Sequence, residues 1–100
     1  MKKEYILCAA IWYHDLETQR FLPANCEKGV VICGWRHSNC TATLTALTGK
    51  NRDEIGDYTQ GFITSKNRFV DRTEAAKIAL ENKQILHDRE MNKLYTEDLY

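Results

Sequence analysis

The stretch over residues 60–79, which reads QGFITSKNRFVDRTEAAKIA, constrains the fold most because it joins a hairpin to a helix without a linker. Two β-prone runs, residues 61–64 and 68–70, flank a polar trio whose Asn tolerates a left-handed backbone, so a tight hairpin is expected. Asp71 and Glu74 then form a capping-box-like helix start. We therefore predict a hairpin that leads directly into a helix.

Two apolar segments supply the rest of a sheet. Residues 5–13 (YILCAAIWY) are apolar on both alternating faces, which predicts a central strand covered on both sides. Residues 29–35 (GVVICGW) are β-branched and apolar, and we predict a second inner strand whose Gly34 allows close approach of another backbone or a ligand. The segment between them, residues 14–28, mixes charges with Pro and Asn and is predicted to be a loop.

A first helix is predicted over residues 40–48, with Ser38 or Asn39 as its cap and Gly49 as its left-handed stop. Threonine is frequent in this segment and lowers its helix propensity, so packing against the sheet must stabilise the helix.

A second helix is predicted from residue 72 to about residue 82. Its apolar residues cover more than half of its circumference, so we expect it to contact the sheet and a further neighbour such as another subunit. The tail, residues 84–100, ends in LYTEDLY, and we expect it to pack back as a short edge strand or clamp.

The order β, β, α, β, β, α predicts one small α+β domain over residues 1–100, with a mainly antiparallel sheet and two α-helices on one face. A chain of 100 residues buries a smaller fraction of its surface than a larger one, and together with the broadly apolar second helix this predicts an oligomer.

The charge balance argues against a polymeric nucleic acid or a membrane as partner. Fourteen Lys and Arg residues equal fourteen Asp and Glu residues, so no global field attracts a polyanion or an acidic lipid surface. The apolar run near the N-terminus is too short to span a bilayer and lacks a cleavage pattern, so a cytoplasmic location is expected. The four cysteines are then expected to remain thiols.

Cys33, His37 and Cys40 form a C-x3-H-x2-C cluster of ligand types that zinc accepts. Only these three lie close in sequence, and cysteine in an apolar strand is usually a packing residue, so we expect no metal. A Cys–His nucleophile pair needs a stabilising cation, which the surrounding sequence does not favour. Because no phosphate-loop, dinucleotide or hydrolase motif is present, we expect neither catalytic residues nor a cofactor, and no enzyme.

Two places are candidates for binding a phosphate. The start of the second helix offers free amides beside Arg68 and Arg72, with Phe62 as an aromatic neighbour for a base. Arg36 and His37, directly after a predicted strand, either contact a phosphate or form a polar cap, and both interpretations stay open. Phe69 is expected in the core.

Four blocks of the chain carry a family resemblance: YILCAAIWY, GVVICGWRHSNC, QGFITSKNRFVDRTEAAKIA and LYTEDLY. Together they resemble the Thoeris anti-defence proteins of the first type, which are phage proteins. Members of that family sequester cyclic ADP-ribose signals made by bacterial TIR proteins without cleaving them. The resemblance implies a homo-oligomer, either a dimer or an assembly of dimers, in the cytoplasm of an infected bacterial host. Some members also hold cyclic oligonucleotides at separate sites.

The resemblance also implies pockets at a subunit interface, lined by aromatic and arginine side chains. Mapped onto this chain, the expected ligand-binding residues are Phe62, Thr64, Arg68 and Arg72, Asp71 as a ribose acceptor, and Arg36 with His37 as a second candidate block. Two other functions remain as alternatives. One is a small enzyme acting on a nucleotide or ADP-ribose derivative through His37 or Cys40, and the other is a phage protein–protein interaction module.

Overall fold

The computed structural model of the chain describes residues 3–51, 54–86 and 92–99. Its elements, in chain order, are β1 (Ile6–Tyr13), β2 (Val30–Gly34), α1 (His37–Thr48), β3 (Tyr58–Thr64), β4 (Phe69–Asp71), α2 (Arg72–Glu81) and a short 3-10 turn, η1 (Thr96–Asp98). The four strands form one antiparallel sheet in the order β2-β1-β3-β4. The predicted α+β class, with an antiparallel sheet and two helices, is confirmed.

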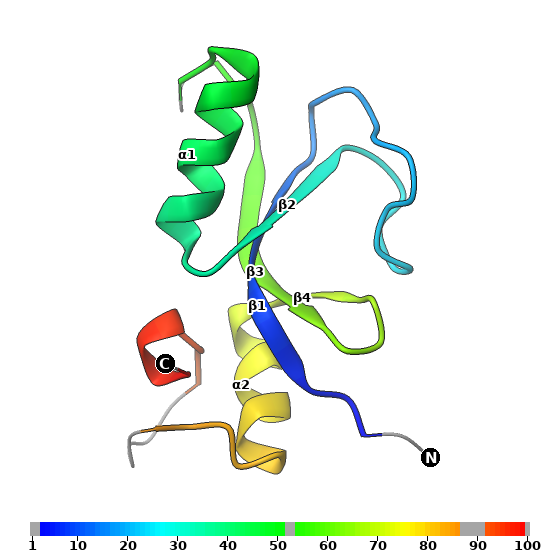
Figure 1. Ribbon diagram of the computed structural model, residues 1–100. Helices are drawn as coiled ribbons and strands as arrows, with labels where there is room; N and C mark the ends of the chain where they lie inside the picture. The colour runs from blue at the N-terminus through cyan, green and yellow to red at the C-terminus, as the bar shows by residue number, and fades with distance from the viewer. Residues whose placement is uncertain (1–2, 52–53, 87–91, 100) are drawn as a thin grey trace.

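Both helices pack on the same face of the sheet, and the loop between β1 and β2 lies on the other face (Figure 1). The predicted central position of the first strand is confirmed, because β1 pairs with β2 on one side and with β3 on the other. The prediction that β2 is an inner strand is wrong, since β2 lies at the edge of the sheet. On its outer side the Val31 amide donates to Oε1 of Gln19 at 2.8 Å, so a loop side chain partly covers this edge.

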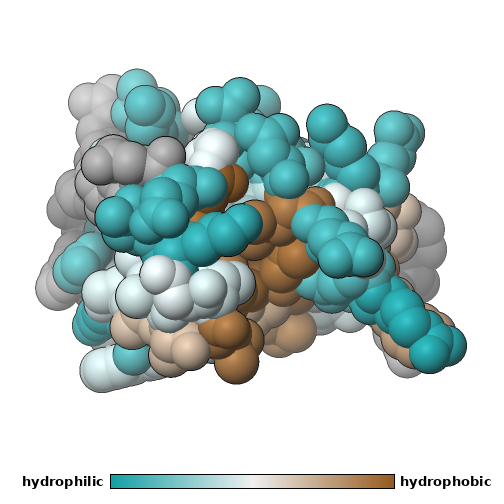
Figure 2. All heavy atoms as spheres, turned by 90° about the horizontal axis from the view of Figure 1, so that it is seen from above, coloured by the Kyte–Doolittle hydropathy of each residue, from teal (hydrophilic) through white to brown (hydrophobic). Residues whose placement is uncertain are grey.

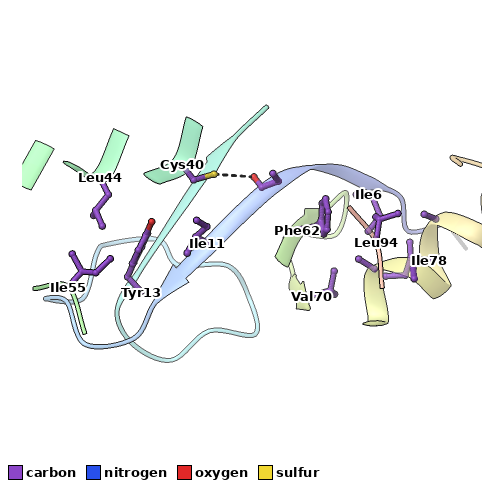
Figure 3. Packing of buried hydrophobic residues seen from close by; sticks show 14 residues of the cluster. Ile6, Ile11, Tyr13, Cys40, Leu44, Ile55, Phe62, Val70, Ile78 and Leu94 are labelled. Atoms are coloured by element: carbon purple, nitrogen blue, oxygen red, sulfur yellow. Dashed lines mark hydrogen bonds between the residues drawn. The ribbon is translucent and has the colours of Figure 1, made fainter. Parts of the chain in front are cut away.

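The core has two parts, one on each face of β1. On the helix face, Ile11 and Tyr13 pack with side chains of α1, while Phe62, Val70 and Leu94 gather near α2 (Figure 3). On the loop face, a smaller cluster contains Ala10, Cys26, Val31 and Phe69. The alternating apolar faces of β1 are therefore both covered, as its sequence predicts, and Phe69 lies in the core as expected.

The hairpin between β3 and β4 follows its predicted local geometry. Asn67 has a φ of 57°, in the left-handed region, and the carboxylate of Asp71 accepts a hydrogen bond from the Glu74 amide at 2.9 Å. The Glu74 side chain bonds the guanidinium of Arg68 at 3.0 Å, so it does not complete the predicted capping box. The hairpin thus runs into α2 without a linker.

Helix α1 begins at His37, earlier than the predicted residue 40. Arg36 occupies the cap position, and its amide donates to Oδ1 of Asn39 at 2.9 Å, so Asn39 caps from inside the first turn. Gly49, with a φ of 71°, ends the helix as predicted. Within the described ranges, neither helix has the length and apolar composition that would let it cross a membrane.

The tail packs back onto the domain as a turn and not as a strand. Leu94 is fully buried, its amide donates to the carbonyl of Arg72 at 2.9 Å, and the Leu86 amide donates to the carbonyl of Asp98 at 2.8 Å. The predicted clamp is confirmed for residues 92–99, while residues 87–91 and 100 of the same tail lie outside the described part of the chain.

The N-terminal segment is held to the hairpin by a carboxylate with several partners. Glu4 receives two hydrogen bonds from the guanidinium of Arg68, at 2.8 and 2.9 Å, and one from the Thr64 hydroxyl at 2.6 Å. The hydrogen bonds from Arg68 have the largest effect on the pKa of Glu4 and lower it, and the hydrogen bond from Thr64 acts in the same direction. Burial raises this pKa but is outweighed, so the pKa falls from 4.5 to about 2. The ionised carboxylate therefore stabilises the fold.

We predict that Glu4→Gln lowers the free energy of unfolding at pH 7 by about 1.5–3 kcal/mol, the usual range for hydrogen bonds to a charged group. Because the pKa of Glu4 is lowered on folding, its contribution is complete above pH 4.5 and is lost as the pH falls toward 2. Denaturant titrations from pH 7 to 2 should show a shallower acid decline in the variant. An equal effect of Glu27→Gln, which changes an exposed loop glutamate, would contradict this explanation.

Candidate functional site

A pocket of about 220 Å³ lies where the start of α1, the start of α2 and the C-terminal segment meet. We call it the arginine pocket. Its lining consists of Arg36, His37, Ser38, Arg72, Tyr95, Thr96 and Glu97. The pocket thus collects residues from three separate parts of the chain, and two of them are arginines.

Arg72, the first residue of α2, supplies the most enclosed charge. Its guanidinium donates to the carbonyl of Leu94 at 2.8 Å and to Oε1 of Gln60 at 2.7 Å, and it lies over the ring of Tyr95 at 4.6 Å. Burial lowers its pKa, and in the described part of the chain no carboxylate lies within ion-pair distance of it. Arg72 is therefore a half-buried cation held by neutral groups, to which an anion would be complementary.

His37 orients Arg72. Its Nε2 lies 2.8 Å from the carbonyl of Gly61, so Nε2 carries the proton and donates. Nδ1 is then an acceptor, 3.4 Å from Nη2 of Arg72. Burial is the main cause that lowers the pKa of His37, and the charge of Arg72 acts in the same direction. The imidazole is therefore neutral at pH 7, with both of its nitrogens engaged.

Arg36 is the second arginine that lines the pocket. Its Nη1 donates to the Thr96 hydroxyl at 2.9 Å and lies 3.7 Å from Oε1 of Glu97, and its guanidinium stacks over Trp35 at 4.7 Å. The Glu97 side chain is 72% exposed, so this ion pair is weak and opens readily. An incoming anion competes with Glu97 for Arg36.

The remaining groups of the pocket are an aromatic side chain and two backbone amides. Tyr95 is 44% exposed. The amides of His37 and Ser38 precede the first backbone hydrogen bond of α1, which the Asn39 amide donates to the carbonyl of Arg36 at 3.0 Å. Among the described residues, no three His, Cys, Asp or Glu side chains are placed to hold a metal ion. Cys40 is buried, with its thiol directed at the carbonyl of Ala9. The pocket is built for electrostatic and stacking contacts.

Three of the seven residues predicted from the sequence, Arg36, His37 and Arg72, come together in this pocket. The expectation that Phe62 faces a ligand is wrong for this chain. Its ring is fully buried and meets His37 edge-on at 5.2 Å, so Phe62 supports the pocket from the core. The cause is the alternation of β3, which turns Phe62 toward the helices.

The start of α2 is not the open phosphate seat that its sequence suggested. Thr64 is buried and donates to Glu4, and Arg68 is paired with both Glu4 and Glu74. The carboxylate of Asp71 accepts the hydrogen bond of the Glu74 amide, so this amide is not available to a phosphate. These residues clamp the hairpin and do not line the arginine pocket, and their assignment to a ligand stays a prediction.

Sequence reasoning missed Gln60 and the tail residues Tyr95, Thr96 and Glu97. The aromatic and acidic composition of the tail indicated a clamp, but no local pattern indicates that it returns to the starts of both helices. Their place follows from contacts that join distant parts of the chain, such as the bond from Arg36 to Thr96.

The fold and the pocket define a small α+β domain with a pocket that two arginines line. The model of the phage T4 y16D protein family matches residues 5–100, and the chain belongs to this family. The expectation of a phage protein is thereby confirmed. The searches of curated proteins and of solved structures gave no match.

We predict that protonation of His37 lowers the free energy of unfolding at mildly acidic pH. Because burial lowers its pKa from 6.5, the unfolded chain binds the proton more readily, so stability is complete above pH 6.5 and declines as the pH falls below it. In His37→Gln, whose amide can still donate to Gly61, the unfolding free energy should change little between pH 7 and 5. Urea titrations measure this slope. The control His14→Gln should decline like wild type, and a decline that persists in His37→Gln would refute the prediction.

Proposed function

We propose that this protein is a phage anti-defence sponge that binds a cyclic ADP-ribose isomer made by a bacterial TIR protein and withholds it without cleaving it. The observation that carries the proposal is the half-buried Arg72, which has no carboxylate partner among the described residues and lines the arginine pocket together with Arg36. The family match supports a phage protein, and the resemblance of the sequence to Thoeris anti-defence proteins supplies the ligand class.

The chemistry of the ligand matches that of the pocket. A cyclic ADP-ribose carries two linked phosphates, whose charges complement two arginines, and charge-assisted hydrogen bonds from guanidinium to phosphate are strong and directional. Tyr95 offers a ring face for the adenine, and aromatic stacking on a base contributes about 1–3 kcal/mol in single-strand binders. Arg36, Arg72 and Tyr95 therefore supply the charge and the stacking surface that this ligand requires.

The size of the pocket favours a site that a second copy of the chain completes. At about 220 Å³ the arginine pocket is smaller than the range of about 300–1,000 Å³ typical of ligand sites, so one chain encloses only part of the ligand. Large hydrophobic side chains are also exposed, including Trp35, Leu47 and Leu80. Seen from above, a band of hydrophobic residues lies between hydrophilic ones (Figure 2). Such surface suits burial against another subunit.

The state of His37 supports binding without cleavage. A general base needs a free nitrogen within reach of the proton that it removes, but Nε2 donates to Gly61 and Nδ1 faces Arg72. The pocket therefore lacks an available imidazole base, which favours sequestration over hydrolysis.

The direct experiment is to purify the protein from cells that express an active TIR enzyme, heat it, and identify the released small molecules by mass spectrometry. Release of intact cyclic ADP-ribose would support sequestration. A chemically altered product would make the protein an enzyme. A co-purified host protein without a small molecule would support the interaction module.

We predict opposite effects of two pocket variants on the capture of cyclic ADP-ribose. Arg36→Gln should weaken binding about ten- to a hundredfold, because it removes charged hydrogen bonds worth about 1.5–3 kcal/mol. Glu97→Gln should tighten binding about two- to fivefold, because it removes a competing exposed carboxylate. Equilibrium dialysis gives both dissociation constants. Arg20→Gln, on the exposed loop, is the matched control, and an effect of Arg20→Gln equal to that of Arg36→Gln would place the binding elsewhere.

We also predict that the binding unit is a homo-oligomer. The molar mass measured by light scattering at micromolar concentration should be at least twice the chain mass of 11.6 kDa. A folded monomer that still captures the ligand would exclude a site shared between subunits.

A further inference from the structure

Two cysteines lie together on the loop face of the sheet, the face opposite the helices. The register pairs Ala10 of β1 with Cys33 of β2. Cys8 is two residues before Ala10, so its side chain projects from the same face, diagonally across from Cys33. Cys8 and Cys33 are therefore neighbours in space, although 25 positions separate them in the sequence.

This pair differs in accessibility from the other cysteines. Cys33 is exposed and Cys8 is partly buried, whereas Cys26 and Cys40 are buried. The loop-face cluster includes Cys26 but neither Cys8 nor Cys33, so the pair lies beyond the part of the sheet that the loop covers. The expectation that all cysteines are packing thiols is wrong for Cys33.

The environment of the pair stabilises a thiolate on Cys8. The neighbouring Cys33 thiol, which can donate to the Cys8 sulfur, is the main cause that lowers the pKa of Cys8 from 9.0 to about 7. A hydrogen bond with the backbone of Gly34 acts in the same direction. The same contact raises the pKa of Cys33, which keeps its proton. At pH 7 about half of the molecules thus carry a nucleophilic thiolate on Cys8 beside the Cys33 thiol.

We propose that Cys8 and Cys33 form a reactive dithiol site that undergoes reversible thiol–disulfide exchange with small disulfides of the oxidised-glutathione class. Cys8 is the attacking residue and Cys33 the resolving residue. The product is a disulfide that joins β1 to β2. Accessible, stabilised thiolates next to a second cysteine are the usual sites of this chemistry.

The exchange balances in two steps. The Cys8 thiolate attacks one sulfur of the small disulfide, forms a mixed disulfide and releases one small thiolate. Cys33 then loses its proton to solvent and attacks the Cys8 sulfur, which forms the Cys8–Cys33 bond and releases the second small thiolate. Counted from the dithiol, including the earlier ionisation of Cys8, the protein loses two electrons and two protons. The two small thiolates take up protons from solvent, so the small disulfide is reduced to two thiols.

The position of β2 allows the bond to close. Diagonal neighbours in an antiparallel pair lie about 7–8 Å apart at Cα, slightly beyond the usual span of a disulfide. β2 is a five-residue edge strand with β1 as its one strand neighbour, and the register of β1 is irregular between Ile6 and Cys8. Closure therefore requires β2 to slide slightly along β1, and the resulting strained disulfide should be easily reduced again.

The test incubates the reduced full-length protein with oxidised glutathione at pH 7 and follows its intact mass. Wild type should lose two hydrogens without a lasting adduct, and peptide mapping should find Cys8 joined to Cys33. Cys33→Ser should accumulate one glutathionyl group on Cys8. Cys8→Ser should react roughly fivefold more slowly, since the gain in thiolate fraction at Cys8 exceeds its loss of intrinsic nucleophilicity. Cys26→Ser is the matched control and should behave like wild type.

A second comparison isolates the hydrogen bond between the thiols. Cys33→Ser keeps a donor toward Cys8 and Cys33→Ala removes it, so alkylation of Cys8 by iodoacetamide at pH 7 should be severalfold slower in Cys33→Ala. Equal rates in these two variants, a disulfide that involves Cys26 or Cys40, or a stable doubly glutathionylated wild type would each overturn the proposal. Circular dichroism of every variant verifies that it is folded.

Discussion

The guanidinium of Arg72 is the contact on which the C-terminal half of the structure depends. It joins α2 to β3 through Gln60, to the tail through Leu94 and Tyr95, and to α1 through His37. A half-buried cation is costly unless hydrogen bonds and nearby negative potential compensate it, and here a carbonyl, an amide oxygen and a ring face do so. The positive charge remains available to an anion, so the groups that hold the tail in place also create the pocket.

The core fixes the geometry of these groups. The Gly61 carbonyl holds His37, and Gly61 lies so close to β4 that an added Cβ would meet the Val70 carbonyl at 2.1 Å, so only glycine fits there. Phe62 next to it packs edge-on against the imidazole. A shift of β3 relative to β4 would therefore displace His37 and, through it, Arg72.

Local patterns in the sequence were sufficient to predict most of the fold. The Asn67 turn, the Asp71 cap and the Gly49 stop each depend on the conformation of one residue, so the sequence shows them directly. Arg72 was found for the same reason, because a charged residue at a helix start is a local feature. The edge position of β2 was missed because strand order depends on tertiary pairing.

The site was predicted less completely because its contacts are long-range. Arg68 looked available for a phosphate, but its partner Glu4 lies 64 residues away in the chain. Phe62 and Thr64 share a face of β3 by the period of two, and that face is the one against which the helices pack. Which face is covered depends on where the helices pack, and the hairpin sequence does not contain this information.

The arginine pocket and the dithiol site lie on opposite faces of the sheet, yet β2 connects them. Cys33 is followed by Gly34, whose added Cβ would lie 3.0 Å from Cβ of Asn39, so the end of β2 packs tightly on the first turn of α1. Arg36 lies between Gly34 and Asn39 in the chain. The two proposed sites are therefore joined by the short segment that runs from Cys33 at the end of β2 to Arg36 at the cap of α1.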